Sequence, residues 1–158
     1  MTIRIGFGYD VHAFAPARPL VLGGVPIPFE YGLSGHSDAD TVIHAVVDAL
    51  LGAAALGDIG SHFPSSDPRW KNQPSAVFLD YTCDLLAQHH WKISNIDATI
   101  VAERPKLAPY IPAMRTHIAE HLHLEIEQIS IKATTTDGLG FAGRREGIGC
   151  YAVALLER

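Results

Sequence analysis

The segment EGIGCYAVALLE, residues 146–157, constrains the fold most, because it is apolar in both registers of a β-strand. Side chains along a strand alternate between the two faces of a sheet. One face would carry Ile148, Ala152, Ala154 and Leu156, and the other Tyr151, Val153 and Leu155. A sheet with two apolar faces needs a cover on each face.

The rest of the chain supplies a cover for only one of these faces. Alternating patterns predict strands over residues 3–14, 93–103 and 128–136, and a hairpin over 19–29 that turns at Gly23–Gly24. Helical spacing predicts helices over residues 38–56, capped by Ser37, and over 75–90 and 109–124. We therefore expect an α/β fold, an α+β sandwich in which one mixed β-sheet carries helices on one face. A second copy of the chain would cover the other face.

Composition and charge narrow the class of protein. The chain has 158 residues, 47% hydrophobic and 18% charged, which predicts a single globular domain spanning residues 1–158. Its net charge of −5 argues against nucleic acid as a partner, because phosphate backbones bind to basic faces. The longest apolar stretch, residues 44–56, is interrupted by Asp48 and is too short for a membrane span. Two cysteines without a C-x-x-C pattern favour a reduced compartment, so we expect a cytoplasmic protein without membrane contact.

A metal site is predicted from two segments. In GYDVHAF, residues 8–14, Asp10 and His12 share one face of the first strand. In the first helix Asp40, His44 and Asp48 are spaced by four residues and form one stripe. We predict that His44 completes a set of three Zn²⁺ ligands with Asp10 and His12, and that Asp40 or Asp48 orients its other ring nitrogen. The alternatives are a polar pair on an exposed strand face and a pairing of His44 with Asp48 on a helix surface.

A second polar segment, KATTTDGLGFAGRREG at residues 132–147, offers hydroxyls, backbone amides and basic side chains. Lys132, Arg144 and Arg145 beside three consecutive threonines can hold phosphate oxygens. Threonines are also ordinary strand formers, and GLG can be a simple turn. The chain has no G-x-x-x-x-G-K-[ST] motif, so the sequence excludes a P-loop reaction.

Six segments together resemble the 2-C-methyl-D-erythritol 2,4-cyclodiphosphate synthase family. They are GYDVHAF, LGGVPIP, GLSGHSDADTVIHAVVDALLGAAALGDIGSHFP, RPKLAPYIPAMR, KATTTDGLGF and GRREGIGC, and the likeness is collinear from Ile3 to Leu156. The resemblance implies a phosphorus–oxygen lyase of non-mevalonate isoprenoid biosynthesis. Such an enzyme converts 4-diphosphocytidyl-2-C-methyl-D-erythritol 2-phosphate to the 2,4-cyclodiphosphate and CMP by metal-assisted intramolecular phosphoryl transfer.

The resemblance also implies roles for particular residues. One Zn²⁺ per subunit would bind Asp10, His12 and His44, and a second ion, Mg²⁺ or Mn²⁺, would bind Asp137. His36 and Thr135 would be catalytic, stabilising the transition state. The small-molecule substrate would contact a larger set: Ser37, Asp58, Ile59, Gly60, Phe63, Pro64, Ser65, Ser66, Asp67, Ala102, Pro105, Lys106, Leu107, Ala108, Thr134, Thr136, Phe141 and Arg144.

Members of this family are homotrimers with active sites between adjacent subunits, and this assembly would cover the second face of the sheet. A prenyl diphosphate can bind in the central channel of some members, near the positions of Phe7, Phe141, Arg144 and Glu146. The chain departs from the family pattern in two places, with Asp137 where glutamate is usual and Ser65 where an acid is common. Two other functions stay open from the residues alone: a zinc-dependent phosphohydrolase and a non-catalytic trimer that binds isoprenoid diphosphates.

Overall fold

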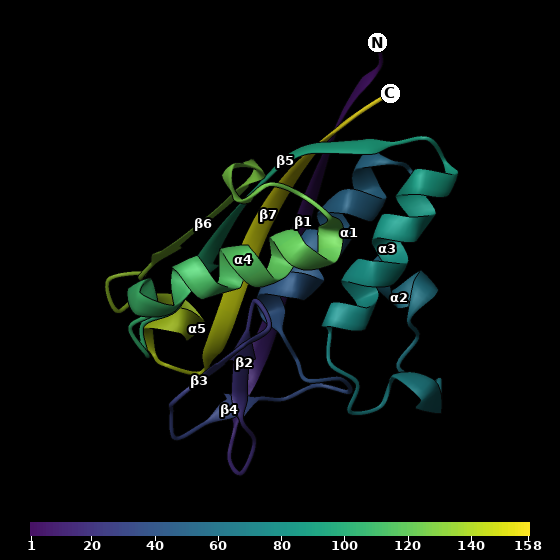
Figure 1. Ribbon diagram of the computed structural model, residues 1–158. Helices are drawn as coiled ribbons and strands as arrows, with labels where there is room; N and C mark the ends of the chain where they lie inside the picture. Colours follow the sequence, from purple (N-terminus) through teal and green to yellow (C-terminus); the bar gives the residue numbers. More distant parts are fainter.

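A five-stranded mixed sheet forms the centre of the computed structural model, which describes residues 1–158 (Figure 1). The strands lie in the order β4–β1–β7–β5–β6. Their bounds are Ile3–Ala15 for β1, Gly32–Leu33 for β4, Lys92–Val101 for β5, Ile129–Thr134 for β6 and Gly147–Glu157 for β7. Neighbouring strands are antiparallel except β5 and β6, which are parallel. The predicted mixed sheet is confirmed, although β6 ends at Thr134, so Thr135 and Thr136 lie in the following loop.

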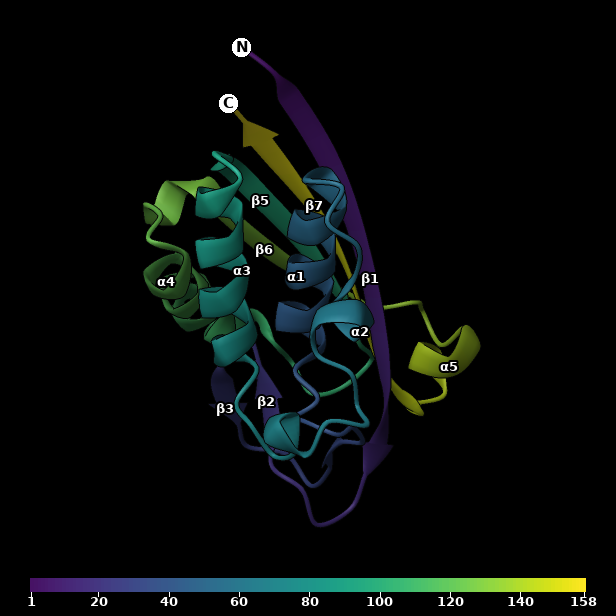
Figure 2. The ribbon, with the colours of Figure 1, turned by 90° about the vertical axis from the view of Figure 1, so that its right-hand side faces the viewer.

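Three helices cover one face of this sheet, as predicted (Figure 2). They are α1, Thr41–Ala53, α3, Ala76–Gln88, and α4, Ile111–Leu122. The helix α5, Gly140–Gly143, lies away from them, beyond β1 in Figure 2. The connections contain α2, Ile59–His62, and three 3₁₀ turns, Pro68–Trp70, Ala108–Tyr110 and Ile126–Gln128. No helix combines the length and the apolar composition that crossing a bilayer requires.

The two faces of the sheet differ in burial. The side chains of β7 that face the helices are buried: Ile148, Cys150, Ala152, Ala154 and Leu156. The opposite face is also apolar but exposed, and Ile5 and Phe7 of β1 are 72% and 62% exposed. Tyr9, Val11, Tyr151 and Val153 extend this exposed face. A single chain therefore covers one apolar face and leaves the other open.

A separate antiparallel hairpin forms where the sequence predicts it. Its strands are β2, Leu20–Leu22, and β3, Val25–Ile27. Gly23 and Gly24 between them have φ angles of 57° and 75°, a left-handed conformation that glycine adopts without strain. The N–H groups of both glycines donate to the carboxylate of Asp40, at 2.8 and 2.7 Å. The hairpin turn is thereby tied to the start of α1.

The first helix begins later than predicted. Its N-cap is Asp40, whose Oδ1 atom accepts hydrogen bonds from the N–H groups of Val42 and Ile43, each at 3.1 Å. Asp40 is fully buried, and its hydrogen bonds to four backbone donors offset the loss of hydration. The prediction that Ser37 caps this helix is wrong, because the Ser37 hydroxyl faces His44 instead. The helix also ends at Ala53 and does not reach residue 56.

The two ends of the chain lie side by side. The N–H of Thr2 donates to the carbonyl oxygen of Arg158 at 2.7 Å, and the N–H of Arg158 donates to that of Thr2 at 3.0 Å. Both figures place the termini together at the end of the sheet opposite the hairpin (Figures 1 and 2). The first and last strands, β1 and β7, are paired from Ile3 to Ala13 of β1 and over the whole of β7.

Almost no space separates the backbones of α1 and β1. A Cβ atom added to Gly6 would lie 1.8 Å from the carbonyl oxygen of Ala49, and one added to Gly8 would lie 2.0 Å from that of Ala45. Both obstacles are backbone atoms, so a change of rotamer cannot remove them. The glycines therefore allow the helix to lie directly on the strand.

We predict that Gly8→Ala lowers the free energy of unfolding by about 3 kcal/mol or more, because its methyl group pushes α1 away from β1. Gly52→Ala on α1 is the matched control, since the nearest atom to its added Cβ is 4.0 Å away. Alanine in that helix is expected to be neutral or to stabilise it by about 0.5–1 kcal/mol. Urea unfolding measures both, and a wild-type value for Gly8→Ala would contradict the close packing.

Candidate active site

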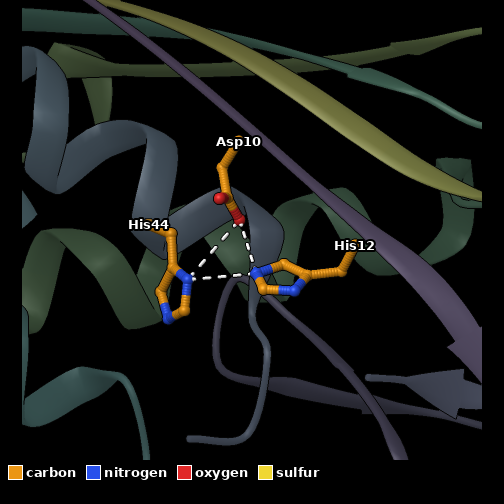
Figure 3. Close-up of side chains that lie close together, drawn as sticks. All are labelled: Asp10, His12 and His44. Carbon is orange, nitrogen blue, oxygen red and sulfur yellow. Dashed lines mark hydrogen bonds and ion pairs between the residues drawn. The ribbon is translucent and has the colours of Figure 1, made fainter. Parts of the chain in front are cut away.

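The side chains of Asp10, His12 and His44 point toward one another (Figure 3). Asp10 and His12 come from β1, and His44 comes from α1. Asp10 Oδ2 lies 2.8 Å from His12 Nε2 and 3.4 Å from His44 Nδ1, and the two ring nitrogens are 3.3 Å apart. All three side chains are partly buried. The predicted triad is thus brought together by the contact of α1 with β1.

The chemistry of these three residues fits a divalent metal ion. Asp10 Oδ2 is buried and makes no hydrogen bond of acceptable geometry, although both imidazoles are near it. His12 Nδ1 lies 2.7 Å from the carbonyl oxygen of Ser34, so it carries the proton and donates, which leaves the lone pair of Nε2 facing the cluster. One carboxylate and two imidazoles form a three-ligand set with room for a further ligand, as in catalytic zinc sites. The cluster is therefore a candidate metal centre.

Electrostatics at the cluster favour a bound cation. Burial acts to raise the pKa of Asp10, but the imidazoles of His12 and His44 beside its carboxylate outweigh burial and lower the pKa to about 2. Burial acts to lower the pKa of His12, yet the Asp10 carboxylate raises it overall. Asp10 is therefore negatively charged at neutral pH, and its charge favours the protonated form of His12. A metal ion bound between these side chains would neutralise the negative charge of the Asp10 carboxylate in place of that proton.

The other ring nitrogen of His44 meets hydroxyl groups and no carboxylate. His44 Nε2 lies 2.9 Å from Ser75 Oγ and 3.2 Å from Ser37 Oγ. The prediction that Asp40 or Asp48 orients His44 is not supported, because Asp40 caps α1 and Asp48 Oδ1 accepts from the N–H of Ile59 at 2.7 Å. The sequence analysis missed Ser75, which is 31 residues from His44 and resembles an ordinary helix cap.

A cavity of about 390 Å³ opens beside the metal ligands. It brings together His36, which the resemblance predicts to be catalytic, and many residues that it assigns to the substrate: Ser37, Ile59, Gly60, Phe63, Pro64, Ser65 and Ser66. Asp58 and Asp67 flank it as caps of α2 and of the 3₁₀ turn at Pro68–Trp70. Trp70 and Phe78 also line the cavity, and the sequence analysis did not select them.

Aromatic side chains pack in the wall of this cavity, and a half-buried arginine fixes one of its loops. The ring of Phe63 stacks on Phe78 with centroids 4.3 Å apart and meets Trp70 edge-on at 5.1 Å. On the other side, Arg18 donates to the carbonyl oxygens of Gly35 at 2.8 Å and Ser37 at 2.7 Å. The loop that carries His36 is thus fixed by two charge-assisted hydrogen bonds.

The remaining predicted residues line other pockets. A pocket of about 400 Å³ is lined by Ala102, Pro105, Lys106, Leu107, Ala108, Thr134 and Thr135. Another, of about 280 Å³, contains Thr136 and Phe141 together with Tyr9 and Tyr151 of the exposed apolar face. Asp137 is exposed, and its Oδ1 accepts from Thr135 Oγ1 at 3.4 Å. Arg144 Nε donates to Glu146 at 2.9 Å. One chain therefore does not gather the predicted site residues around the metal ligands.

The fold and this cluster define an α/β protein with a candidate metal centre beside a cavity. The chain belongs to the YgbB family, whose model matches residues 3–157. Two similar proteins, from Clostridium perfringens and Geobacter metallireducens, are both named 2-C-methyl-D-erythritol 2,4-cyclodiphosphate synthase. They are 56% and 58% identical over 156 residues, which is 99% of this chain and 100% and 99% of theirs. The resemblance found in the sequence is confirmed.

Solved structures with these names have the same fold. A CDP-bound 2C-methyl-D-erythritol-2,4-cyclodiphosphate synthase has a TM-score of 0.89 and 37% identity over 98% of this chain and 100% of its own. The bifunctional IspDF from Campylobacter jejuni has a TM-score of 0.94 and 42% identity, and it matches 98% of this chain but only 42% of its own. This chain therefore corresponds to one part of the longer bifunctional protein.

We predict that His44→Ala removes the bound divalent metal while the fold survives, because the strands and helices around the site are packed independently of the ion. His89→Ala, at the exposed end of α3, is the matched control and is expected to keep the metal. Metal content after dialysis and circular dichroism measure the two effects. Full metal occupancy in His44→Ala would contradict the assignment of the centre.

Proposed function

We propose that this chain is a 2-C-methyl-D-erythritol 2,4-cyclodiphosphate synthase, an enzyme of non-mevalonate isoprenoid precursor biosynthesis. Its substrate is 4-diphosphocytidyl-2-C-methyl-D-erythritol 2-phosphate. The observation that carries the proposal is the cluster of Asp10, His12 and His44 beside a cavity, in a chain that belongs to this family along its whole length. The reaction class is that of a phosphorus–oxygen lyase, and the expected location is the cytoplasm.

The reaction needs positioning more than it needs a separate nucleophile. An oxygen of the 2-phosphate forms a bond to the β-phosphorus of the diphosphate. The bond from that phosphorus to the bridging oxygen breaks, and CMP leaves with this oxygen. Both reacting groups belong to one molecule, so the protein contributes by folding the substrate and neutralising its oxygens.

The metal centre would hold Zn²⁺ through Asp10, His12 and His44. When bound, zinc supplies a Lewis acid for a phosphate oxygen. Asp137 offers a hard carboxylate oxygen for a second divalent ion, Mg²⁺ or Mn²⁺, which binds substrate phosphates together with few protein ligands. Its exposed position suits a ligand that is shared with a substrate.

The chain's own polar groups would complete the site. The loop of His36 and Ser37, which Arg18 fixes, places an imidazole and a hydroxyl beside the metal ligands. These donors are suited to align phosphate oxygens in the transition state. Thr135 contributes a hydroxyl in the same way from the other pocket. Asp58, Ile59 and Gly60 would hold the methylerythritol portion of the substrate.

The pocket of residues 102–108 would hold the cytidine portion. It has the size for a pyrimidine nucleoside, and its two basic side chains, Arg104 and Lys106, are exposed where a phosphate can reach them. Two of the solved relatives contain CDP by name. In a single chain this pocket and the metal cavity are lined by different residues, which supports a site that a second chain completes.

A homotrimer would bring the two halves of the site together. The exposed apolar face formed by β1 and β7 supports this assembly, since a second chain would bury it. A central channel at that face, near Phe7, Phe141, Arg144 and Glu146, remains a predicted site for a prenyl diphosphate. The active sites would then lie between adjacent subunits.

Phosphorus NMR of the reaction tests the function directly. Incubation of the substrate with the metal-loaded enzyme is expected to give a cyclic diphosphate and CMP in equal amounts. Release of inorganic phosphate alone would identify a phosphohydrolase, and no turnover would identify a binding protein. Either result would overturn the proposal.

We predict that mixed trimers of Asp10→Ala and Lys106→Ala recover activity that neither variant has alone. One variant keeps the cytidine half of the site and the other keeps the metal half. Random mixing of equal amounts leaves about one quarter of the interfaces with two intact halves, so about one quarter of wild-type activity is expected. A mixture of Asp10→Ala with His44→Ala is the matched control, because both lack the same half. Absence of recovery, with subunit exchange verified by mass spectrometry, would contradict a shared site.

A further inference from the structure

The hydroxyl of Ser75 is used in an unusual way for a helix cap. Ser75 is the N-cap of α3, yet its side chain makes no capping hydrogen bond. It is fully buried, and its Oγ atom lies 2.9 Å from His44 Nε2 and within a short hydrogen bond of Asp38 Oδ1. A serine at this position normally satisfies a backbone N–H of the first turn. The first turn of α3 lacks that hydrogen bond. The hydroxyl of Ser75 lies instead between the carboxylate of Asp38 and the imidazole of His44.

The positions of the protons in this chain follow from counting donors. Asp38 is a carboxylate and can only accept, so the single proton of the Ser75 hydroxyl is donated to Asp38 Oδ1. The oxygen of Ser75 can then accept a hydrogen bond. His44 Nε2 is the atom that donates it, so Nε2 carries a proton. With Nε2 protonated, the lone pair of the neutral imidazole lies on Nδ1, which faces Asp10 and His12.

Asp38 is itself held in place by the backbone. Its Oδ2 accepts from the N–H of Ser75 at 2.9 Å, and its Oδ1 accepts from the N–H of Asp40 at 3.1 Å. The second hydroxyl near His44, that of Ser37, makes no hydrogen bond to this carboxylate and lies 3.5 Å from Ser75 Oγ. Ser75 is therefore the link between His44 and a fixed negative charge.

We propose that Ser75 and Asp38 are positioning residues that fix the Nε2–H tautomer of His44 and so present Nδ1 to the metal. The inference rests on the proposed metal centre at Asp10, His12 and His44. Metal-bound histidines commonly donate their second N–H to a carboxylate, which orients the ring and strengthens the ligand. Here the hydroxyl of Ser75 lies between the Asp38 carboxylate and the His44 imidazole, so the carboxylate orients the ring through this hydroxyl.

The test compares variants of the full-length chain by their affinity for Zn²⁺ and Co²⁺ alone, measured by chelator competition. Ser75→Ala is expected to bind both ions about 10–100-fold more weakly, and Asp38→Asn is expected to weaken binding in the same direction. Ser75→Thr, which keeps the hydroxyl, is expected to restore most of the affinity. Thr82→Val is the matched control, because Thr82 is equally buried in α3 and its hydroxyl has no hydrogen-bonding partner.

Nitrogen NMR of the histidine rings reports the tautomer independently of activity. After the zinc is removed by chelation, His44 of the wild-type chain is expected to show the Nε2–H form, and Ser75→Ala is expected to show a mixture of tautomers. Wild-type metal affinity and a single His44 tautomer in Ser75→Ala would overturn the positioning role of Ser75 and Asp38. If His44→Ala kept its zinc, the proposed metal centre itself would be wrong, so the two failures are distinguishable.

Discussion

Direct contact between the backbones of α1 and β1 is the constraint on which the rest of the structure depends. Gly6 and Gly8 leave the space that the carbonyl oxygens of Ala49 and Ala45 occupy. His44 directly precedes Ala45, and Asp10 follows Gly8 on the same face of β1, so the contact places an imidazole from the helix against side chains of the strand. A helix at ordinary distance from a sheet would stand several ångströms further away and would separate these ligands.

Three acidic side chains, of which Asp40 is buried and Asp38 and Asp48 are half-buried, connect this contact to the surrounding loops. Asp40 holds the β2–β3 turn at the first turn of α1, and Asp48 holds the N–H of Ile59 at the start of α2. Asp38 joins the beginning of α1 to the beginning of α3 through Ser75. Each carboxylate accepts bonds from backbone donors that no helix or strand would satisfy. The walls of the metal cavity are therefore fixed to one helix.

The sequence was sufficient for the fold class and the metal triad, because both follow from local periodicity. Strand alternation places Asp10 beside His12, and the polar stripe on a mostly apolar helix singles out His44. Helical spacing does not show which neighbour a side chain meets, so it wrongly assigned Asp40 and Asp48 to His44. The partner of His44 is Ser75, which is distant in sequence and reaches it only through the packing of α3 on α1. His36 and Thr135 line different pockets of this chain, and the periodicity of the sequence does not show how such pockets lie relative to each other.

The adjacent ends of the chain determine where further protein can be joined to this fold. Thr2 and Arg158 are hydrogen-bonded neighbours, and about seven residues of extended strand, roughly 20–25 Å, separate this end of β1 from Asp10. A domain fused at either terminus would leave the metal cavity clear, and so would a purification tag. The bifunctional protein from Campylobacter jejuni matches this chain over 42% of its own length, so the same fold occurs there within a longer chain. The same adjacency makes the chain suitable for circular permutation, with a short linker closing the old ends.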